Sequence, residues 1–307
     1  MFTEKKAMFI YCASPVHMGA GTSLGVIDNP IQRERHTEHP VMAGSGIKGA
    51  MRHPAEGNGI DKGTASKIFG PEPAKNDDGH AGAISFSDGQ IVLFPVRCLK
   101  EGFVYATCPL ALARLARLLD AVGVKHDIAP TIKVMEGQCA TATDEVLAGG
   151  KLILEAYEYT DVTTCRATLE TAAKWLSENV IPSDGGFSFF KEKIARHTVV
   201  LNDGEFAFFV KNATVVEPHV CIDDASGTAK DRGLFFTENL PPESLLVSLA
   251  MASEERKKKG SEEDGKDSAA TIIGKITEGF NNKMLQIGGD ATTGRGQVFI
   301  KFVGGAA

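Results

Sequence analysis

The sequence predicts one elaborated domain of the α+β class over residues 1–307, without internal repeats. Short apolar runs typical of strands alternate in mixed order with amphipathic helical stretches. Long connections rich in glycine separate these runs, and 33 of the 307 residues are glycine. A hydrophobic content of 43% beside 23% charged residues is ordinary for a globular protein and sufficient for a buried core.

The first half of the chain predicts strands, one long loop and one helix. Residues 8–13 form an apolar run typical of a strand. Residues 14–49 show almost no hydrophobic periodicity and predict a loop whose length is typical of a binding segment. Residues 91–96 and 152–157 are further predicted strands. Pro109 begins, and Gly123 ends, a stretch whose leucines recur on one face of a helix.

The second half predicts a helix, a projecting hairpin and a final strand. Asp203 is a candidate N-cap for a helix that includes Phe206, Phe209 and Val210. Val215–Ile222 alternates as a strand, and the turn-rich residues 223–232 predict the tip of a hairpin over residues 215–245. Residues 252–270 are highly charged and predict a mobile loop, after which residues 297–303 close the chain as a strand.

Composition limits the classes of function. The net charge is −6, so any surface for a polyanion such as nucleic acid must be local. The six cysteines form no CxxC pair and no zinc-ligand spacing, which predicts reduced thiols. No apolar stretch reaches the roughly 20 residues of a membrane span, and the N-terminus does not resemble a signal peptide. These features predict a soluble cytoplasmic protein with no membrane partner.

Titratable and basic residues concentrate in the first long loop. Between residues 17 and 53 lie His17, His36, His39, His53, Arg33, Arg35, Lys48 and Arg52 against the acidic Asp28, Glu34 and Glu38. Glycines in this stretch would let backbone N–H groups approach phosphate oxygens, and Lys48 and Arg52 would add charge-assisted contacts. The alternative is a solvated loop whose charges bind nothing.

Two other site classes fit the pattern poorly. Residues 44–49 match GxGxxG, but residues 39–43 are a poor strand and Pro54 would shorten a following helix, which argues against a dinucleotide site. The histidine spacing matches no zinc pattern.

An ordered set of motifs runs through the chain. These are residues 17–19 (His-Met-Gly), 25–34, 44–52, 86–88 (Phe-Ser-Asp), 93–97, 233–242 and 288–296. In order and spacing they resemble the RAMP-superfamily backbone subunits of type III-B (Cmr) CRISPR complexes, and the resemblance covers the whole chain. It departs at residues 37–40 (Thr-Glu-His-Pro) and 43–46 (Ala-Gly-Ser-Gly).

The resemblance implies a modified ferredoxin-like core, related to RNA-recognition folds, with a projecting thumb hairpin. Copies would stack head to tail along a guide crRNA and meet a target RNA. Further implied partners are the large subunit, the small subunit and the guide-end RAMP subunits. The implied region for catalysis and guide binding covers residues 14–90.

The resemblance also implies a metal-dependent endoribonuclease that uses Mg²⁺ or Mn²⁺. Asp28 would act as the catalytic carboxylate and metal ligand, with His17 as proton donor or acceptor and the target 2′-hydroxyl as the attacking group. Glu238 and Asp88 are weaker catalytic candidates. The implied RNA-binding residues are Arg33, Ser45, Gly46, Lys48, Gly49, Arg52, Gly294, Arg295 and Gly296.

Two alternatives remain open at this point. The same scaffold could bind RNA without cleaving it, as related backbone subunits do. A small-molecule enzyme could instead use the glycine-rich segments to hold a phosphorylated cofactor.

Overall fold

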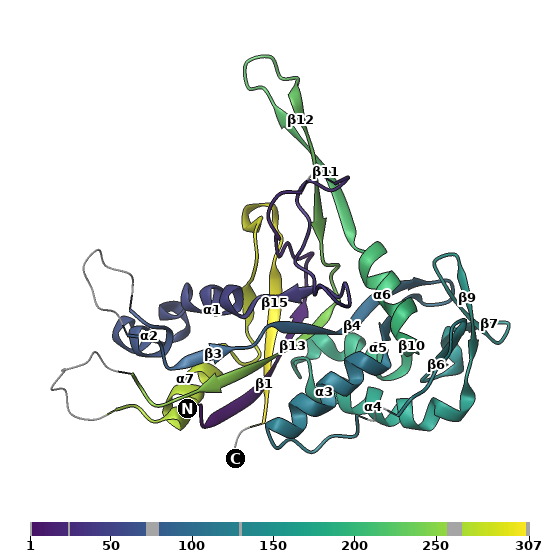
Figure 1. The fold of residues 1–307 in the computed structure, drawn as a ribbon, viewed down its shortest axis with the longest axis horizontal. Coiled ribbons are helices and arrows are strands. Elements are labelled where there is room, and N and C mark those ends of the chain that lie inside the picture. The colour runs from purple at the N-terminus through teal and green to yellow at the C-terminus, as the bar shows by residue number, and fades with distance from the viewer. Residues whose placement is uncertain (1, 24, 72–79, 129–130, 257–265, 305–307) are drawn as a thin grey trace.

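A computed structural model describes residues 2–23, 25–71, 80–128, 131–256 and 266–304. At its centre, strand β1 (Glu4–Cys12) lies between β15 (Gln297–Val303) and β13 (Leu245–Ala252) and is antiparallel to both. β13 pairs in turn with β4 (Gly89–Cys98), also antiparallel. Helices surround this sheet, as Figure 1 shows. The mixed architecture confirms the predicted α+β class, and the order β15-β1-β13-β4 is compatible with the implied ferredoxin-like core.

The other strands extend this sheet or form a separate hairpin. Within the sheet they are β2 (Val41–Met42), β3 (Ile84–Phe86), β5 (Gly102–Thr107), β6 (Gln138–Thr141), β7 (Leu147–Ala148), β8 (Lys151–Leu154), β9 (Tyr157–Asp161), β10 (Thr198–Leu201) and β14 (Met284–Gln286). The hairpin consists of β11 (Val215–Ile222) and β12 (Ala229–Asn239). The helices are α1 (Gly44–Arg52), α2 (Lys62–Phe69), α3 (Pro109–Ala121), α4 (Arg166–Asn179), α5 (Ser188–His197), α6 (Asp203–Asn212) and α7 (Ala269–Phe280).

β1 separates two hydrophobic cores. Because successive side chains of a strand point to opposite faces, Met8 and Ile10 enter one core while Phe9 and Tyr11 enter the other, and all four are buried. α7 packs on the first core through its isoleucines, and α3 and α4 pack on the second. A central strand buried on both faces fixes the sheet register, because a slip of one residue would exchange the two sets.

The predicted helix at Pro109 is confirmed as α3. Proline occupies its first turn, where the missing N–H costs nothing, and the Cys108 sulfur accepts a hydrogen bond from the Ala111 N–H. The second predicted helix is confirmed as α6, but its N-cap is Asn202 rather than Asp203. The Asn202 side chain accepts from the Glu205 N–H at 2.9 Å, and Asp203 is the first helical residue.

Two expectations were wrong. Residues 152–157 are not one strand, because β8 ends at Leu154 and β9 begins at Tyr157, with Glu155 between them in the left-handed region at φ 50°. The stretch from 14 to 49 is irregular only as far as Val41, and its glycine motif forms α1. Gly44 is needed there for close packing, since a Cβ on it would lie 2.2 Å from the Phe86 carbonyl oxygen.

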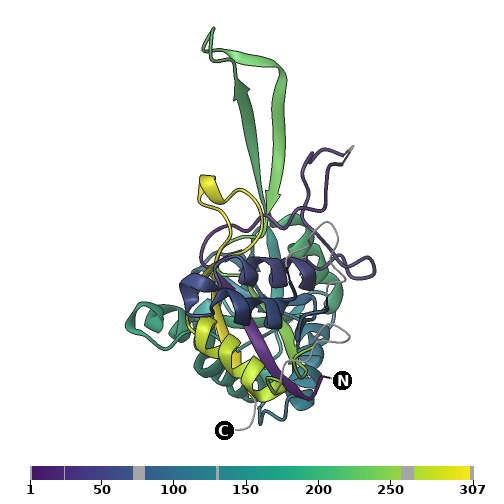
Figure 2. The same cartoon turned by 90° about the vertical axis from the view of Figure 1, so that its left-hand side faces the viewer.

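The hairpin of β11 and β12 projects from the body of the molecule, as Figures 1 and 2 show, so the predicted projecting hairpin is confirmed. At its tip the Asp223 carboxylate accepts from the Ala225 and Ser226 N–H groups, and Gly227 adopts φ 66°. The predicted mobile loop over 252–270 includes residues 257–265, which lie outside the described residues. Its bounds were too wide, because Ala252 belongs to β13, α7 begins at Ala269, and the buried Glu255 donates its N–H to the Asp267 carbonyl at 2.9 Å.

The cysteines are free, as predicted, and four of the six are buried. Burial raises the pKa of the Cys12, Cys108 and Cys139 thiols. Within the described ranges no helix has the length and apolar character to cross a membrane.

Glu243, between β12 and β13, makes stability depend on pH. Its carboxylate accepts a hydrogen bond from the Tyr11 hydroxyl, whose oxygen lies 3.0 Å from that of Tyr105. Burial raises the pKa of Glu243 from 4.5 to about 7. Between these values the folded chain holds a proton that the unfolded chain has lost, so the free energy of unfolding falls as pH rises through this window.

We therefore expect Glu243→Gln to leave the melting temperature almost unchanged at pH 4.5 and to raise it at pH 8. At pH 8 the free energy of unfolding should rise by less than about 3 kcal/mol. A pKa raised from 4.5 to about 7 corresponds to about 3.5 kcal/mol, and the partial solvent exposure of Glu243 lowers this figure. Thermal denaturation at both pH values tests this, with the exposed Glu178→Gln on α4 as control. An equal shift of the melting temperature at both pH values would contradict the expectation.

Candidate nucleic-acid interface

The edge of β12 that faces away from β11 holds the first long loop. On this edge the Phe236 N–H donates to Asp28 Oδ2 at 2.8 Å, and the Phe236 carbonyl accepts from the Asn29 N–H at 3.0 Å. Two residues further along, the Glu238 N–H donates to the Asn29 carbonyl at 3.0 Å, and the Glu238 carbonyl lies 2.7 Å from His17 Nδ1. The loop thus satisfies the four backbone polar groups of Phe236 and Glu238.

This pairing brings Asp28 and His17 together on one strand. Their anchor points are two residues apart, which is about 7 Å along an extended chain. On the other strand of the hairpin, Pro218 lies opposite Phe236, at a position where the ladder between β11 and β12 needs no N–H. Asp28 is half-buried, and its second carboxylate oxygen has no hydrogen-bond partner within the described ranges. That oxygen is available to a ligand.

His17 is oriented for proton exchange at Nε2. The carbonyl next to Nδ1 fixes the proton of the neutral ring on Nδ1, which leaves Nε2 as an acceptor. A Cβ on Gly19 would lie 2.9 Å from Nε2, so a larger residue there would displace the ring. The Gly289 N–H donates to the His17 carbonyl at 2.9 Å, so the last glycine-rich loop also packs here.

Glu238 lies beneath this site rather than in it. The residue is 3% exposed, and its carboxylate accepts hydrogen bonds from the Ile31 N–H at 3.0 Å and the Thr214 hydroxyl at 2.7 Å. The Arg33 guanidinium adds an ion pair at 2.5 Å. With its carboxylate occupied in this way, the surroundings of Glu238 favour an architectural role over the predicted catalytic one.

The Arg33 side chain is likewise occupied by contacts within the protein. Besides Glu238, its guanidinium donates to the Val210 carbonyl at 2.9 Å and the Glu38 carbonyl at 2.8 Å. These contacts join the first loop to the C-terminal end of α6. The surroundings of Arg33 therefore favour an anchor over the predicted RNA contact.

Asp88, the other weaker candidate, lies at the start of α1. Its carboxylate accepts from the Gly44 N–H at 2.8 Å, where a helix N-terminus stabilises negative charge. This contact gives Asp88 a structural role in orienting α1.

α1 presents five of the predicted RNA-binding residues. Ser45, Gly46 and Gly49 are exposed, and Lys48 and Arg52 are half-buried. Because two of the five are glycine, this side of the helix leaves its backbone open to close approach.

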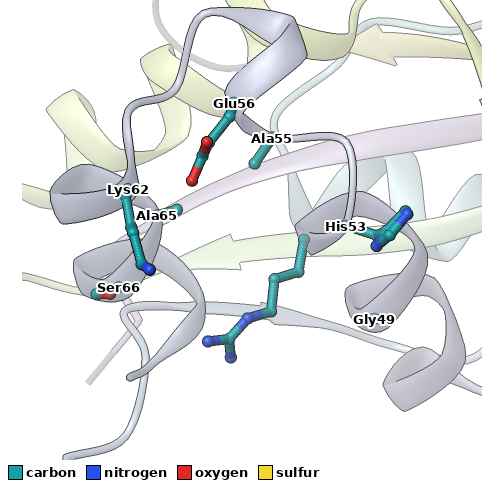
Figure 3. Close-up of a pocket in the computed structure, with 8 residues that line it drawn as sticks. Gly49, His53, Ala55, Glu56, Lys62, Ala65 and Ser66 are labelled. Atoms are coloured by element: carbon teal, nitrogen blue, oxygen red, sulfur yellow. The ribbon is translucent and has the colours of Figure 1, made fainter. Parts of the chain in front are cut away.

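Three neighbouring hollows of about 120, 500 and 490 Å³ lie along α1, and each shares lining residues with the next. The first reaches from His17 to Gly46, the second from Gly46 to Gly49, and the third from Gly49 past Arg52 to α2. Figure 3 shows His53 and Lys62 on opposite sides of the third hollow.

The charge along α1 is positive. Burial lowers the pKa of Lys48, and repulsion from Arg52 and Arg256 lowers it further. Three cations therefore lie close enough to repel one another, which is a local surplus of positive charge on a chain of net charge −6. An anion that bound here would relieve this repulsion.

The last glycine-rich loop meets the base of the hairpin. The Arg295 guanidinium forms an ion pair with Glu217 on β11, and the Gly296 N–H donates to the Pro15 carbonyl at 2.8 Å. Gly294 has open space where a side chain would extend. The structure therefore brings Gly289 beside His17 and Gly296 beside Pro15. The RNA-binding role of Gly294, Arg295 and Gly296 stays a prediction.

The described residues offer a metal only part of a site. Within the described part of the chain, no three His, Cys, Asp or Glu side chains gather to hold an ion. Asp28 has one free carboxylate oxygen. Mg²⁺ is commonly held by one or two carboxylates completed by substrate phosphates and water, so the donor present fits a metal that arrives with RNA.

Sequence reasoning missed two positioning residues, Asn29 and Gln32. Asn29 makes both central backbone bonds to β12. The Gln32 side chain donates to the Gly19 carbonyl at 3.0 Å and accepts from the Ala43 N–H at 3.2 Å, which ties the His17 segment to the start of α1. The only local signal was the Asn29-Pro30 turn.

Comparisons with known proteins agree with one another. The model of the RAMP superfamily matches residues 9–299. The CRISPR system Cmr endoribonuclease Cmr4 of Pyrococcus furiosus is 33% identical over 290 residues, which are 94% of this chain and 92% of that protein. The crystal structure of oligomeric Cmr4 from Pyrococcus furiosus superposes with a TM-score of 0.75 at 27% identity, covering 99% of this chain and 100% of that one.

A more distant structure shares the fold. A chain in the cryo-EM structure of the type III-B Cmr-beta complex bound to cognate target RNA has a TM-score of 0.70 at 17% identity, with 98% of each chain covered.

Proposed function

Because the chain belongs to the RAMP superfamily, we propose that it is the repeating backbone subunit of a type III-B CRISPR effector complex. In this role it binds a guide crRNA and cleaves complementary target RNA at regular intervals. The observation that carries the proposal is the pair of side chains, Asp28 and His17, held on one strand edge at the base of a projecting hairpin. The 33%-identical relative is named an endoribonuclease.

The arrangement suits guide binding along α1 and target cleavage at the foot of the hairpin. The hollows along α1 are lined by Gly46, Gly49 and Arg52, and Lys48 lies close to Arg52. An open helix backbone beside these cations suits the sugar–phosphate backbone of a guide. The hairpin rises from the same base and would interrupt the guide–target duplex. A target phosphate displaced at the foot of the hairpin, where the hairpin meets the body of the protein, would lie near Asp28 and His17.

The proposed reaction is attack of a target 2′-hydroxyl on the adjacent phosphorus. A P–O bond forms to the 2′-oxygen and the P–O5′ bond breaks, which leaves a 2′,3′-cyclic phosphate and a 5′-hydroxyl. His17 Nε2 accepts the 2′-hydroxyl proton when the one free Asp28 oxygen holds a metal ion, and otherwise that oxygen can accept it. The leaving 5′-oxygen takes up a proton from water. A Mg²⁺ or Mn²⁺ ion held by Asp28 and RNA phosphates would neutralise charge on the phosphate.

The structure supports the two alternative functions unequally. A scaffold that binds RNA without chemistry remains the second candidate, because the hydrogen bond from Phe236 to Asp28 would also suit a purely structural turn. For the small-molecule enzyme that holds a phosphorylated cofactor, the structure removes the dinucleotide form of the site. β2 before the glycine motif is two residues long and antiparallel to β4, so the parallel βαβ unit of such enzymes does not form there.

The proposal is tested by expressing the chain together with its neighbouring subunits and a guide. We expect the purified complex to carry RNA of defined length and to cut a complementary target into fragments that differ by one regular interval. A complex that forms without RNA, or that cuts at a single site only, would contradict a repeating backbone role.

RNA affinity should depend on α1. We expect Lys48→Ala with Arg52→Ala to weaken guide binding alike for every sequence. The slope of log affinity against log salt should fall by roughly one unit per lost phosphate contact. The control is Lys100→Ala with Arg117→Ala, which removes the same charge from exposed positions elsewhere. Equal losses in the two double variants would mean that only net charge matters.

A further inference from the structure

A second cleft lies away from α1 and the hairpin edge. It has a volume of about 440 Å³ and is formed by β9, the first turn of α6 and the segment before β6. We call it the aromatic–acidic cleft. Its wall consists of Tyr157, Tyr159, Phe208, Glu136 and Glu205.

The aromatic wall is exposed yet firmly supported. Tyr157 and Phe208 are 48% and 43% exposed, and their ring centroids lie 5.3 Å apart at an interplanar angle of 78°. Behind them Phe209 is buried, with its ring centroid 5.6 Å from that of Phe208. Two large rings at this exposure leave apolar faces open to a partner.

The two carboxylates beside this wall lack a cation. Glu205 is held in place because Oε1 accepts from the Gly137 N–H at 2.8 Å and Oε2 accepts from the Asn202 side-chain amide at 2.7 Å. Burial raises the pKa of Glu205, and the nearby charge of Glu136 raises it further. Within the described ranges neither Glu136 nor Glu205 has a basic side chain as hydrogen-bond partner.

We propose that the aromatic–acidic cleft receives an arginine or lysine side chain of a protein subunit packed beside this chain in the effector complex, an inference that rests on the proposed function. A cation gains from the faces of Tyr157 and Phe208 and from the negative charge of Glu136 and Glu205. The same charge repels RNA phosphates. Met135, which precedes Glu136 in the sequence, is 69% exposed, and methionine is enriched at protein interfaces.

The first experiment measures the affinity of the isolated protein for a small organic cation. The probe is N-acetyl-arginine methylamide, and N-acetyl-citrulline methylamide is its uncharged counterpart of nearly equal shape. We expect the arginine probe to bind about tenfold more tightly and to perturb NMR signals of Tyr157 and Phe208. Glu136→Lys should abolish this preference because its ammonium fills the cleft. The exposed Glu178→Lys on α4 should not. Equal binding of the two probes would overturn the cation site.

Phe208→Ala provides an independent variant. It leaves both carboxylates in place and removes the exposed ring, so the arginine probe should lose about tenfold in affinity while the melting temperature stays near that of the parent. Unchanged affinity in this variant would show that the aromatic wall does not take part, which contradicts the proposal.

The second experiment places the cleft in the assembly. In complexes co-expressed with guide RNA, Glu136→Lys should lower the amount of a neighbouring protein subunit retained at raised salt, while Glu178→Lys retains it. The guide RNA bound per chain should stay the same, because the cleft is not on the proposed RNA path. If the arginine probe binds but Glu136→Lys complexes keep every subunit, the cleft is a site for a free organic cation and the partner proposal is wrong. Absence of guide RNA from the parent would instead contradict the proposed function alone.

Discussion

An assembled complex that carries Asp28→Asn should hold its target RNA as tightly as the parent and cut it at none of the regularly spaced sites. The amide oxygen of asparagine can still accept the Phe236 N–H, so the loop keeps its place on β12. The negative charge needed for metal ligation or proton abstraction is lost. Loss of a general base typically costs about 10²–10⁴ in rate, and loss of a metal ligand can cost more.

The measurement is single-turnover cleavage in saturating Mg²⁺ or Mn²⁺, beside a binding titration on the same preparation. Asp184→Asn, an exposed aspartate far from the site in sequence, makes the same chemical change as a control. Cleavage at the parental rate would remove Asp28 from the chemistry and favour the scaffold alternative. Parallel loss of binding and cleavage would make Asp28 a structural turn residue.

Arg33→Ala should destabilise the free chain by about 3–5 kcal/mol, because it leaves the buried Glu238 carboxylate without its charge partner. It also removes the donor to the Val210 and Glu38 carbonyls. Urea denaturation of the isolated chain measures the change. Arg35→Ala is the matched control, since Arg35 is exposed and two residues away. We expect it to change the free energy of unfolding by less than about 0.5 kcal/mol.

A double variant separates the ion pair from the packing around it. Arg33→Met with Glu238→Gln removes both charges while keeping side chains of similar length, and it should recover much of the lost stability. If Arg33→Ala instead leaves stability intact and weakens RNA binding, Arg33 is the RNA contact that the sequence suggested.

Local patterns predicted the elements that depend on local interactions. The alternation of Val215–Ile222 predicted that strand with its bounds, and residues 297–303 were predicted correctly as the final strand. Proline at the start of α3 marked that helix. α1 was missed because its glycines suggested a loop. The constraint on Gly44 is the Phe86 carbonyl, 42 residues away in sequence, which no local pattern contains.

The same distinction explains the candidate site. Asp28 and His17 were predicted only through the motifs shared with a known family, and the structure now brings them to one strand edge. The buried pair of Arg33 and Glu238 could not be foreseen, since its partners are 205 residues apart and both residue types are usually exposed. An arginine in a basic loop therefore suggested an RNA contact.

The first long loop pairs with the base of the hairpin but not with its outer part, so the two parts should differ in stiffness. At the base of the hairpin the loop lies along β12 as a third strand, because Asn29 bridges Thr237 and Val16 bridges Leu240 just after β12. Beyond Pro218 and Phe236, toward the tip, only β11 and β12 pair. A two-stranded ribbon is far more compliant than a three-stranded one. The outer, two-stranded part of the hairpin should therefore bend more easily than its three-stranded base, and the bend should occur just beyond Phe236. A tilt of the outer part of the hairpin would leave Asp28 and His17 at the same spacing, so the proposed cleavage site could keep its geometry on duplexes of varied local shape.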